Sequence, residues 1–442
     1  MMSSVFLFSS SSFFFYFFLF LFSTSPLLQV TAQPPPNPDQ YPLNWTFVEE
    51  FEVPINAPAV VCVGTENYCY VVGGEYAVKD TGPDQYAWEC SKNMSGFNLT
   101  SGEWHYNLSP LVKHRCFAQI GIVFDRPDHY KIFAIGGQES GGVQNPDGPI
   151  SGTPYTEIYD LDYDEWNVVT PSLDFPHCSW NWNAGVSHHA TVVVNTTIFV
   201  MGGGHGVSQG IDGISACTWV LETSNPNATW QIMNSAAEGG KLPQRAQGAG
   251  SAFLNNTVYF FGGTSCDGMS QGALGNCSVF ADDDAKPVEH GPYTQTYRLD
   301  WTAGLQRAQG NFQAINWTEP GTAVWVLDSE MDIPRNGISG FLDISRDMII
   351  ASGGFYEDIL DEVEVFNGTH WHPAYPLLDA RMYAGAAGLS FPPGFDVKKW
   401  YKDAKKANGD QPIPVGLVLG GFSTIPGDST MPLTTAEVLM GK

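Results

Sequence analysis

The sequence predicts an all-β protein. Its 442 residues include 47 glycines, and aromatic residues make up 13% of the chain, whereas charged residues make up only 15%. Helices are rich in Glu, Lys, Arg and Ala, while strands and turns favour aromatic, β-branched and Gly residues, so this composition favours strands joined by turns. With 43% hydrophobic residues the chain can bury a large core, which excludes wholesale disorder.

A repeat that runs through the chain is the second observation. Six times a run of apolar residues ends in Gly-Gly, and successive pairs lie 60 to 91 residues apart. The first glycines of the pairs are Gly73, Gly136, Gly202, Gly262, Gly353 and Gly420. Each run is β-branched and aromatic, which predicts a strand buried on both faces. The paired glycines let the backbone leave the strand through conformations that other residues rarely adopt.

Further strands are expected on both sides of each Gly-Gly. Upstream lies a segment of small and apolar residues, such as residues 248–253, which suits a crowded central position. Downstream a polar, Gly-rich loop leads to another strand and then to an aromatic pair. Tyr159 and Trp166 form one pair and Phe97 and Trp104 another, in both cases seven residues apart. Each unit therefore predicts several short strands in a fixed order.

On these features the chain resembles the kelch-repeat β-propeller family, whose units combine a double glycine with a later Tyr and Trp. The resemblance covers residues 41–442 and implies a six-bladed kelch-type β-propeller, with four-stranded blades around a central channel. The last unit ends at its third strand, Thr434–Met440, and an aromatic segment at Asn44–Phe51 supplies the missing strand. We expect this N-terminal strand to close the ring. The blades are expected at 56–110, 111–176, 177–243, 244–334, 335–380, and 381–442 together with 41–55.

The N-terminus and the sequons predict a secreted glycoprotein. Residues 1–32 carry no Asp, Glu, Lys or Arg, hold an apolar centre too short to span a bilayer, and end in a signal-peptidase pattern, Val30-Thr31-Ala32. They form a signal peptide in this interpretation, with an uncleaved anchor as the alternative, and residues 33–40 form a Pro-rich leader. Ten Asn-x-Ser/Thr sequons follow, at Asn44, Asn93, Asn98, Asn107, Asn195, Asn227, Asn255, Asn276, Asn316 and Asn367.

Eight cysteines, all after the signal segment, predict disulfides rather than a metal–thiolate cluster, since no Cys-x-x-Cys occurs. Eight cysteines allow 105 pairings. Pairing in sequence order is the most economical hypothesis, and it joins Cys62 to Cys69, Cys90 to Cys116, Cys178 to Cys217, and Cys266 to Cys277.

The charge balance limits the partners. Lys and Arg number 20 against 46 Asp and Glu, a net charge of −26. A field this negative repels phosphates, which disfavours nucleic acid and anionic membranes, and no second apolar run of membrane length follows the signal segment. The sequence leaves the oligomeric state open.

Candidate binding residues gather on one expected face, where the loops after Gly-Gly and the linkers before the first strands emerge. They are Arg115, Arg245, Arg335, Arg381, Trp180, Trp182, His205 and Tyr356. A ring of arginines would bind carboxylates of a ligand. In the alternative interpretation, which we favour, each arginine pairs with a carboxylate of the protein and fixes one blade to the next. The two tryptophans suit the stacking of a sugar ring or ordinary blade packing.

No catalytic, metal or cofactor motif is visible. His188 and His189 are neighbours on an expected strand and point to opposite faces, so they do not share one ion easily. The sequence therefore favours a module without cofactors that binds an extracellular protein or glycan. The alternatives are carbohydrate-active enzymes on the same fold, a sugar epimerase or, less favoured, a copper-radical oxidase.

Overall fold

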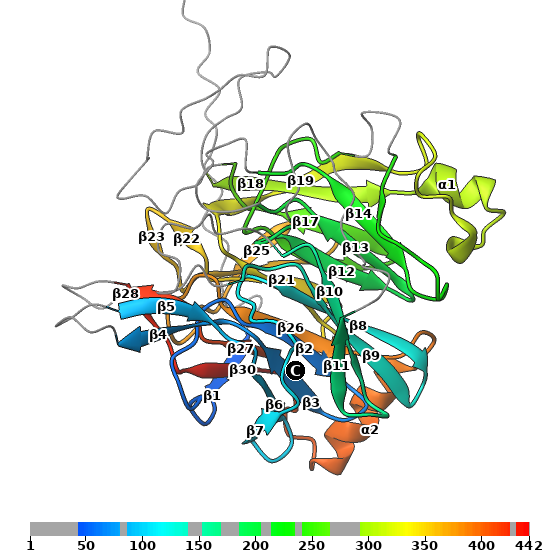
Figure 1. Cartoon of the computed structure of the whole chain (residues 1–442). Coiled ribbons are helices and arrows are strands. Elements are labelled where there is room, and N and C mark those ends of the chain that lie inside the picture. The colour runs from blue at the N-terminus through cyan, green and yellow to red at the C-terminus, as the bar shows by residue number, and fades with distance from the viewer. Residues whose placement is uncertain are drawn as a thin grey trace, which may run out of the picture. The chain divides into compact units, whose positions relative to one another are not determined.

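The computed structural model describes residues 43–79, 86–139, 153–168, 185–204, 214–234, 241–265, 292–424 and 430–441. The expected signal peptide at residues 1–32 and the leader at 33–40 lie outside the described residues. Within them the protein is all-β, with a propeller-like ring of small four-stranded sheets (Figure 1).

The described residues form four separate four-stranded sheets, and in each of them the strands pair antiparallel and in chain order. The first contains β8 (Gln119–Arg126), β9 (His129–Ile135), β10 (Thr156–Asp160) and β11 (Glu165–Val168). The second contains β12 (Ala190–Val194), β13 (Thr197–Met201), β14 (Thr218–Glu222) and β15 (Gln231–Ile232). The third contains β16 (Gly250–Leu254), β17 (Thr257–Phe261), β18 (Tyr293–Asp300) and β19 (Val324–Arg335). The fourth contains β20 (Ser339–Asp343), β21 (Met348–Ser352), β24 (Val363–Phe366) and β25 (Trp371–Ala374).

The remaining long strands form one eight-stranded sheet, so the expectation of six separate four-stranded blades needs correction. One half of this sheet contains β2 (Ala59–Val63), β3 (Tyr68–Val72), β6 (Met94–Asn98) and β7 (Glu103–Leu108). The other half contains β26 (Gly385–Ser390), β27 (Pro414–Leu419), β30 (Ala436–Met440) and β1 (Asn44–Phe47). The physical reason for the merger is a short parallel pairing of β2 with β26, which places Cys62 opposite Leu389 and Val63 opposite Ser390.

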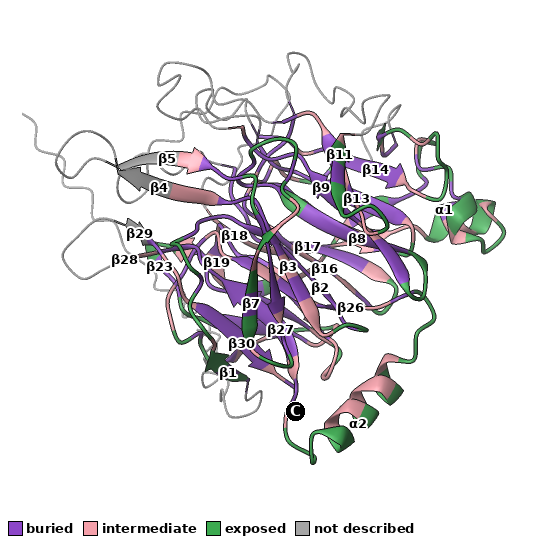
Figure 2. Cartoon of the chain, turned by 60° about the horizontal axis from the view of Figure 1, so that its bottom comes forward, coloured by how far each residue is buried: buried purple, intermediate pink, exposed green. Residues whose placement is uncertain are grey.

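The N-terminal strand pairs as the sequence predicted. β1 lies antiparallel to β30, with Asn44 opposite Met440 and Phe47 opposite Glu437. The innermost strands also adjoin one another in a closed order, β2, β8, β12, β16, β20, β26 and again β2. Buried side chains fill the spaces between neighbouring sheets, and Figure 2 shows the buried strands at the centre of the fold.

The Gly-Gly pairs make the joints between successive sheets. The amide of the second glycine donates to the carbonyl of a residue on the linker into the next sheet, as Gly354 does to Arg381 over 2.8 Å. We call these acceptors the junction residues: Ile55, Arg115, Val186, Ala246, Arg335 and Arg381. The first glycine has a positive φ, +61° at Gly353, and a Cβ there would lie 2.3 Å from the Arg381 carbonyl oxygen. Glycine is thus required for conformation and for space.

The outer strands are attached to the preceding sheet by tryptophans. The indole of Trp371 on β25 donates to the Thr296 hydroxyl on β18 over 2.8 Å, and Trp325 on β19 donates to Thr218 on β14 over 3.0 Å. The predicted aromatic pairs stand opposite each other on paired strands, as Phe97 does with Trp104. A buried indole needs a partner for its N–H, so each of these bonds fixes the angle between two sheets.

Short hairpins and helical insertions complete the fold. Three hairpins follow Gly-Gly pairs: β4 (Glu75–Lys79) with β5 (Tyr86–Cys90), β22 (Phe355–Tyr356) with β23 (Asp358–Ile359), and β28 (Phe422–Thr424) with β29 (Thr430–Pro432). Helix α1 (Thr302–Arg307) and a 3₁₀ turn (Phe312–Ala314) lie between β18 and β19, and helix α2 (Val397–Ala407) lies between β26 and β27. Neither helix reaches the length and apolar character that crossing a bilayer requires, and this holds for every helix in the described ranges.

Two predicted disulfides are confirmed. Cys62 is bonded to Cys69, directly opposite it on β3, and Cys90 is bonded to Cys116. Cys217 is also disulfide-bonded. The predicted partner of Cys217, Cys178, and the predicted pair Cys266–Cys277 lie outside the described residues.

We expect Gly353→Ala to destabilise the protein more than Gly409→Ala. Both glycines have a φ near +60°, but a Cβ at Gly409 meets nothing within 4 Å, whereas one at Gly353 collides with the Arg381 carbonyl. The control should lose about 1 kcal/mol from the backbone strain alone, and Gly353→Ala about 3 kcal/mol or more. Equal losses in denaturant unfolding would show that the junction does not depend on the close approach.

Candidate functional site

A closed ring of backbone hydrogen bonds surrounds the axis of the fold. Each innermost strand is preceded, two residues earlier, by a residue with positive φ, and we call these six the ring residues: Ala57, Phe117, His188, Gly248, Gly337 and Tyr383. The amide of each ring residue donates to the carbonyl of the ring residue of the neighbouring unit, over 2.8 to 3.3 Å, until the last bond joins Ala57 to Tyr383. The ring therefore holds all six linkers at fixed positions around the axis.

Three ring residues are aromatic and lie together, and we call them the aromatic trio. The rings of Phe117 and His188 stack with centroids 4.0 Å apart, and Tyr383 stands edge-on to both, 5.6 Å from Phe117 and 5.5 Å from His188. His188 and Tyr383 are partly exposed. The Asn336 amide donates to the Tyr383 hydroxyl over 3.1 Å, and the Ser187 hydroxyl lies 3.0 Å from His188 Nδ1.

Polar side chains flank the trio on the side of the Gly-Gly loops. Each residue before a ring residue bridges to the residue after a Gly-Gly pair, and one such bridge joins Asn56 to Glu75. The Asn56 amide donates to the Glu75 carboxylate over 3.0 Å, and burial raises the pKa of Glu75. On the neighbouring bridges the Gln138 amide donates to the Ser187 hydroxyl over 3.2 Å. These amides and the hydroxyl are buried, so they hold the linkers beneath the aromatic platform in place.

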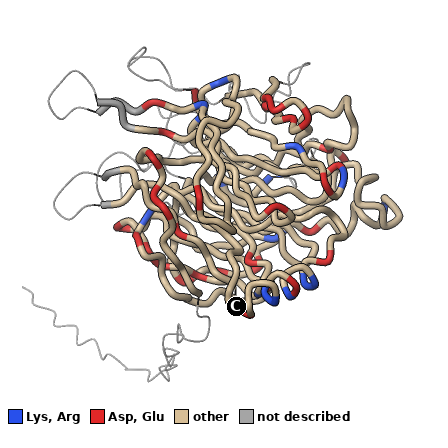
Figure 3. The backbone as a smooth tube through the Cα atoms, turned by 90° about the horizontal axis from the view of Figure 1, so that it is seen from below, with Lys and Arg blue, Asp and Glu red and all other residues tan. Residues whose placement is uncertain are grey.

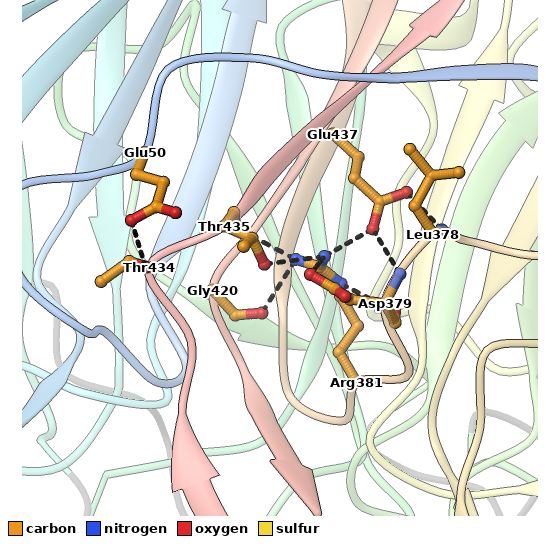
Figure 4. A network of polar contacts seen from close by, with 8 residues as sticks. All are labelled: Glu50, Leu378, Asp379, Arg381, Gly420, Thr434, Thr435 and Glu437. Carbon is orange, nitrogen blue, oxygen red and sulfur yellow. Dashed lines mark hydrogen bonds and ion pairs between the residues drawn. The ribbon is translucent and has the colours of Figure 1, made fainter. Parts of the chain in front are cut away.

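Arg381 occupies the centre of a buried polar network (Figure 4). Its guanidinium donates to the Glu437 carboxylate over 2.5 Å and to the carbonyls of Gly420 and Thr435 over 3.2 and 3.1 Å. Glu437 in turn accepts the amides of Leu378 and Asp379. Burial raises the pKa of Glu437, and the positive charge of Arg381 opposes that shift. The arginine thus joins the linker before its sheet to the third strand of that sheet.

The same network recurs at two other junction residues. Arg115 donates to Glu157 over 2.9 Å and to the Gly136 carbonyl, and Arg335 donates to Glu364 over 2.6 Å and to a glycine carbonyl. Arg115 and Arg335 are fully buried, and Arg381 is 1% exposed. Their guanidinium groups therefore do not face a ligand at the surface. This placement agrees with the structural interpretation. Arg335, the last residue of β19, bonds to Glu364 on the next sheet, whereas Arg115 and Arg381 lie on linkers and bond to glutamates of the sheets that those linkers enter.

The other sequence-predicted residues are dispersed. Arg245 is half-buried and directly precedes the junction residue Ala246. Its place in the repeat is therefore one residue before the place that the other three arginines occupy. Tyr356 is 37% exposed on the hairpin of β22 and β23. Trp180, Trp182 and His205 lie outside the described residues. Of the five predicted site residues that the structure describes, the three buried arginines share a structural role.

The aromatic trio was not predicted from the sequence. A signal for two of its members is present, because Phe117 and Tyr383 each follow a junction arginine by two residues. His188 and His189 precede β12 rather than lie on a strand, so strand alternation does not set their directions. His188 belongs to the trio, while His189 is buried with no hydrogen-bond partner at either ring nitrogen. No group of three or more His, Cys, Asp or Glu in the described part of the chain is placed to hold a metal ion.

Removing one partner of the Arg381–Glu437 pair should be costly. Arg381→Met leaves a buried carboxylate without its cation, so we expect the free energy of unfolding to fall by about 3–5 kcal/mol. Adding Glu437→Gln to that variant should recover part of the loss, because the uncompensated charge disappears. Lys398→Met is the control: its ion pair with Asp347 is exposed, and its loss should be below about 1 kcal/mol. A further loss on adding Glu437→Gln would contradict this account.

Acid should destabilise the fold through His189. Burial lowers the pKa of His189 to about 3, so below the ordinary value near 6.5 the unfolded state takes up a proton that the folded state does not. Stability is therefore lost as pH falls from about 6.5 toward about 3, by up to about 1.4 kcal/mol per pH unit. His189→Leu should flatten this decline in denaturant titrations between pH 7 and pH 4.5, and the exposed His370→Leu should not. An unchanged slope in His189→Leu would assign the acid sensitivity to other groups.

Comparison with known proteins adds evidence on the fold. No protein-family model matches the chain, and no curated protein matches it. A solved structure titled "Structure of YjhT" is similar over 89% of this chain and 96% of that chain, with a TM-score of 0.51 and 13% sequence identity. At this identity the likeness concerns the fold alone, and it supports a propeller-like arrangement of four-stranded sheets.

Proposed function

We propose that the chain is a secreted, N-glycosylated kelch-type propeller that binds an extracellular protein or glycan. The eight-stranded sheet then counts as two blades joined by the β2–β26 pairing, which gives six blades, one for each Gly-Gly pair and each ring residue. Disulfides suit an oxidising compartment, and the sequon asparagines of the described residues are exposed or half-exposed at strand ends and turns.

The observation that carries the proposal is the aromatic trio on its closed ring. Aromatic faces supply contact area at a low entropic cost, and here six backbone hydrogen bonds fix their positions before any ligand arrives. The partly exposed Asn336 and the Tyr383 hydroxyl, which it contacts, offer polar atoms at the edge of the platform. An aromatic face bordered by an amide and a hydroxyl suits a sugar ring or an exposed peptide segment.

Within the ranges that the structure describes, the groups for acid–base chemistry do not converge at the trio, which favours binding over catalysis. Glu75 has a raised pKa, but its hydrogen bond is to Asn56 and its shift arises from burial. Arg115, Arg335 and Arg381 are each ion-paired with a buried glutamate. A sugar-converting site needs a carboxyl and a second charged group beside one pocket.

A glycan array probed with the secreted full-length protein tests the proposal. Tyr383→Ala and Phe117→Ala should weaken binding of the retained glycans by roughly tenfold or more, because each removes an aromatic wall of the platform. Tyr163→Ala is the matched control, since Tyr163 is 76% exposed on the turn between β10 and β11.

Two outcomes would contradict the proposal. One is glycan binding that survives both trio substitutions in correctly folded protein. The other is turnover of a sugar, assayed by anomerisation and oxidation, that Glu75→Gln abolishes without unfolding the protein.

A further inference from the structure

Helix α2 concentrates positive charge in an acidic protein. Five of the chain's 20 Lys and Arg residues lie on this one helix, where they face a single aspartate, so the helix carries a net charge of +4 while the whole chain carries −26. Figure 3 shows the blue turns of the helix beside the C-terminal mark and acidic residues spread over the rest of the described backbone. The five lysines are Lys398, Lys399, Lys402, Lys405 and Lys406.

The lysines share one side of the helix, which we call the lysine side. At 3.6 residues per turn the five cover about 120° of the circumference, and the aspartate, Asp403, lies outside that arc. Lys398, Lys402 and Lys406 follow one another at a spacing of four residues, in a row about 12 Å long. All the lysines are exposed except Lys405, which is half-exposed.

The other side of α2 is already used by the fold. The Trp400 ring meets the Phe391 ring edge-on, with centroids 4.8 Å apart, and Tyr401 packs against the core cluster that contains residues of β27 and β30. The Asp396 carboxylate accepts the amide of Lys399 over 2.9 Å and caps the first turn. The helix is therefore held in place by its apolar side, and Figure 2 shows α2 at the edge of the fold with exposed and half-exposed residues.

The lysines do not stabilise the helix that carries them. Lys398 and Lys399 lie in the first turn, where the helix dipole favours acidic residues, and that turn has none. Lys402 is four residues from both Lys398 and Lys406, a spacing at which like charges are destabilising. Lys398 pairs with Asp347 over 3.1 Å at the surface, and within the described ranges the other four lysines form no ion pair. A positive surface that the fold neither needs nor neutralises indicates an external partner.

We propose that the lysine side of α2 binds a linear anionic polysaccharide, one that carries sulfate or carboxylate groups. The choice of a polysaccharide rests on the extracellular location in the proposed function, but the lysine side is separate from the aromatic trio. Lysine is a flexible point charge, so this surface recognises charge density rather than an exact pattern of groups. At physiological ionic strength charges more than about 8 Å away are largely screened, so the local sign of the charge decides the attraction.

A narrow polymer fits the lysine side better than an anionic membrane does. A basic helix binds a bilayer by burying its apolar side in the lipid, whereas the apolar side of α2 packs on the protein. A flat membrane would also approach neighbouring exposed acids, such as Asp347 and Asp410, together with the lysines. A single polymer chain can follow the row of lysines and avoid those acids.

Affinity measurements on the secreted full-length protein test the proposal. The probes are heparin, which is sulfated, polygalacturonate, which is carboxylated, and dextran, which is neutral. We expect at least one anionic probe to bind, with an affinity that falls as salt is added, and dextran not to bind. The comparison of the two anionic probes identifies the preferred acidic group.

Two matched variants locate the binding surface. The helix variant combines Lys398→Gln, Lys402→Gln and Lys406→Gln, and the control variant combines Lys92→Gln, Lys113→Gln and Lys241→Gln. Each removes three positive charges from exposed lysines, and glutamine has a helix propensity close to that of lysine, so α2 should persist. The helix variant should bind the anionic probe roughly tenfold or more weakly and with a shallower salt dependence, while the control should change by less than about twofold. Arginine at the three helix positions keeps the charge and should retain binding.

Four outcomes would overturn the proposal: no binding of either anionic probe, equal losses in the two variants, binding to phosphatidylserine vesicles as tight as to the polysaccharides, or loss of heparin and polygalacturonate binding in Tyr383→Ala. The last would place the polymer on the trio. If glycan-array binding instead survives the trio substitutions while the helix variant alone loses heparin, the proposed function fails and this inference stands.

Discussion

One hydrogen bond, repeated at each of six joints, sets the position of every sheet relative to the next. It runs from the amide of the second glycine of a pair to the carbonyl of a junction residue. The bond requires a bare first glycine, because a side chain at Gly353 or Gly420 would occupy the place of the carbonyl oxygen 2.3 Å away. From this joint the linker continues for two residues to the ring, so the closed ring of hydrogen bonds depends on the same approach. Trp371 and its equivalents then fix the outer strands.

At three of the six joints the junction residue is a charged arginine, and at the other three it is apolar, so the two kinds of joint can be compared within one molecule. Where the junction residue is Arg115, Arg335 or Arg381, a glutamate stands on the third strand of the sheet that follows the arginine. Where the junction residue is Val186, the position of the glutamate is taken by Trp219, which lies opposite Val200. Where it is Ala246, that position is taken by Tyr297, which lies opposite Phe260. The two partners change together, because a buried arginine without a carboxylate would be strongly unfavourable. The ion pair is therefore one of two ways to fill the joint, and its arginine is a structural residue.

Much of the fold could be predicted from the sequence because its signals are local. The Gly-Gly pairs, the aromatic pairs and the N-terminal strand each depend on residues close in sequence or on one obvious missing strand. Helix α2 was not predicted, although Val397, Trp400, Tyr401 and Ala404 recur at helical spacing, because it is an insertion between two strands of the repeat. The merger of two sheets rests on the short parallel contact at Cys62, and a sequence gives no sign of such pairing.

The candidate site was harder to predict, for a physical reason. Phe117, His188 and Tyr383 lie far apart in the sequence, and they meet only because the ring closes. An arginine before a first strand, by contrast, is conspicuous in the sequence, yet its burial depends on a glutamate about 30 to 60 residues away. Residue type alone cannot distinguish an arginine that faces a ligand from one that is ion-paired with a glutamate inside the fold.

Because the ring is built from backbone groups, it also lets the side chains on its two sides vary independently. It is made of backbone amides and carbonyls, so the side chains above it can vary without breaking it, and the small residues Ala57, Gly248 and Gly337 close it as well as the aromatic ones do. The trio is thus confined to three of six equivalent positions and leaves the platform asymmetric. A cavity to which all six innermost strands contribute shares no lining residue with the trio. A substitution on one side can therefore change recognition there while the backbone that supports the other side stays in place.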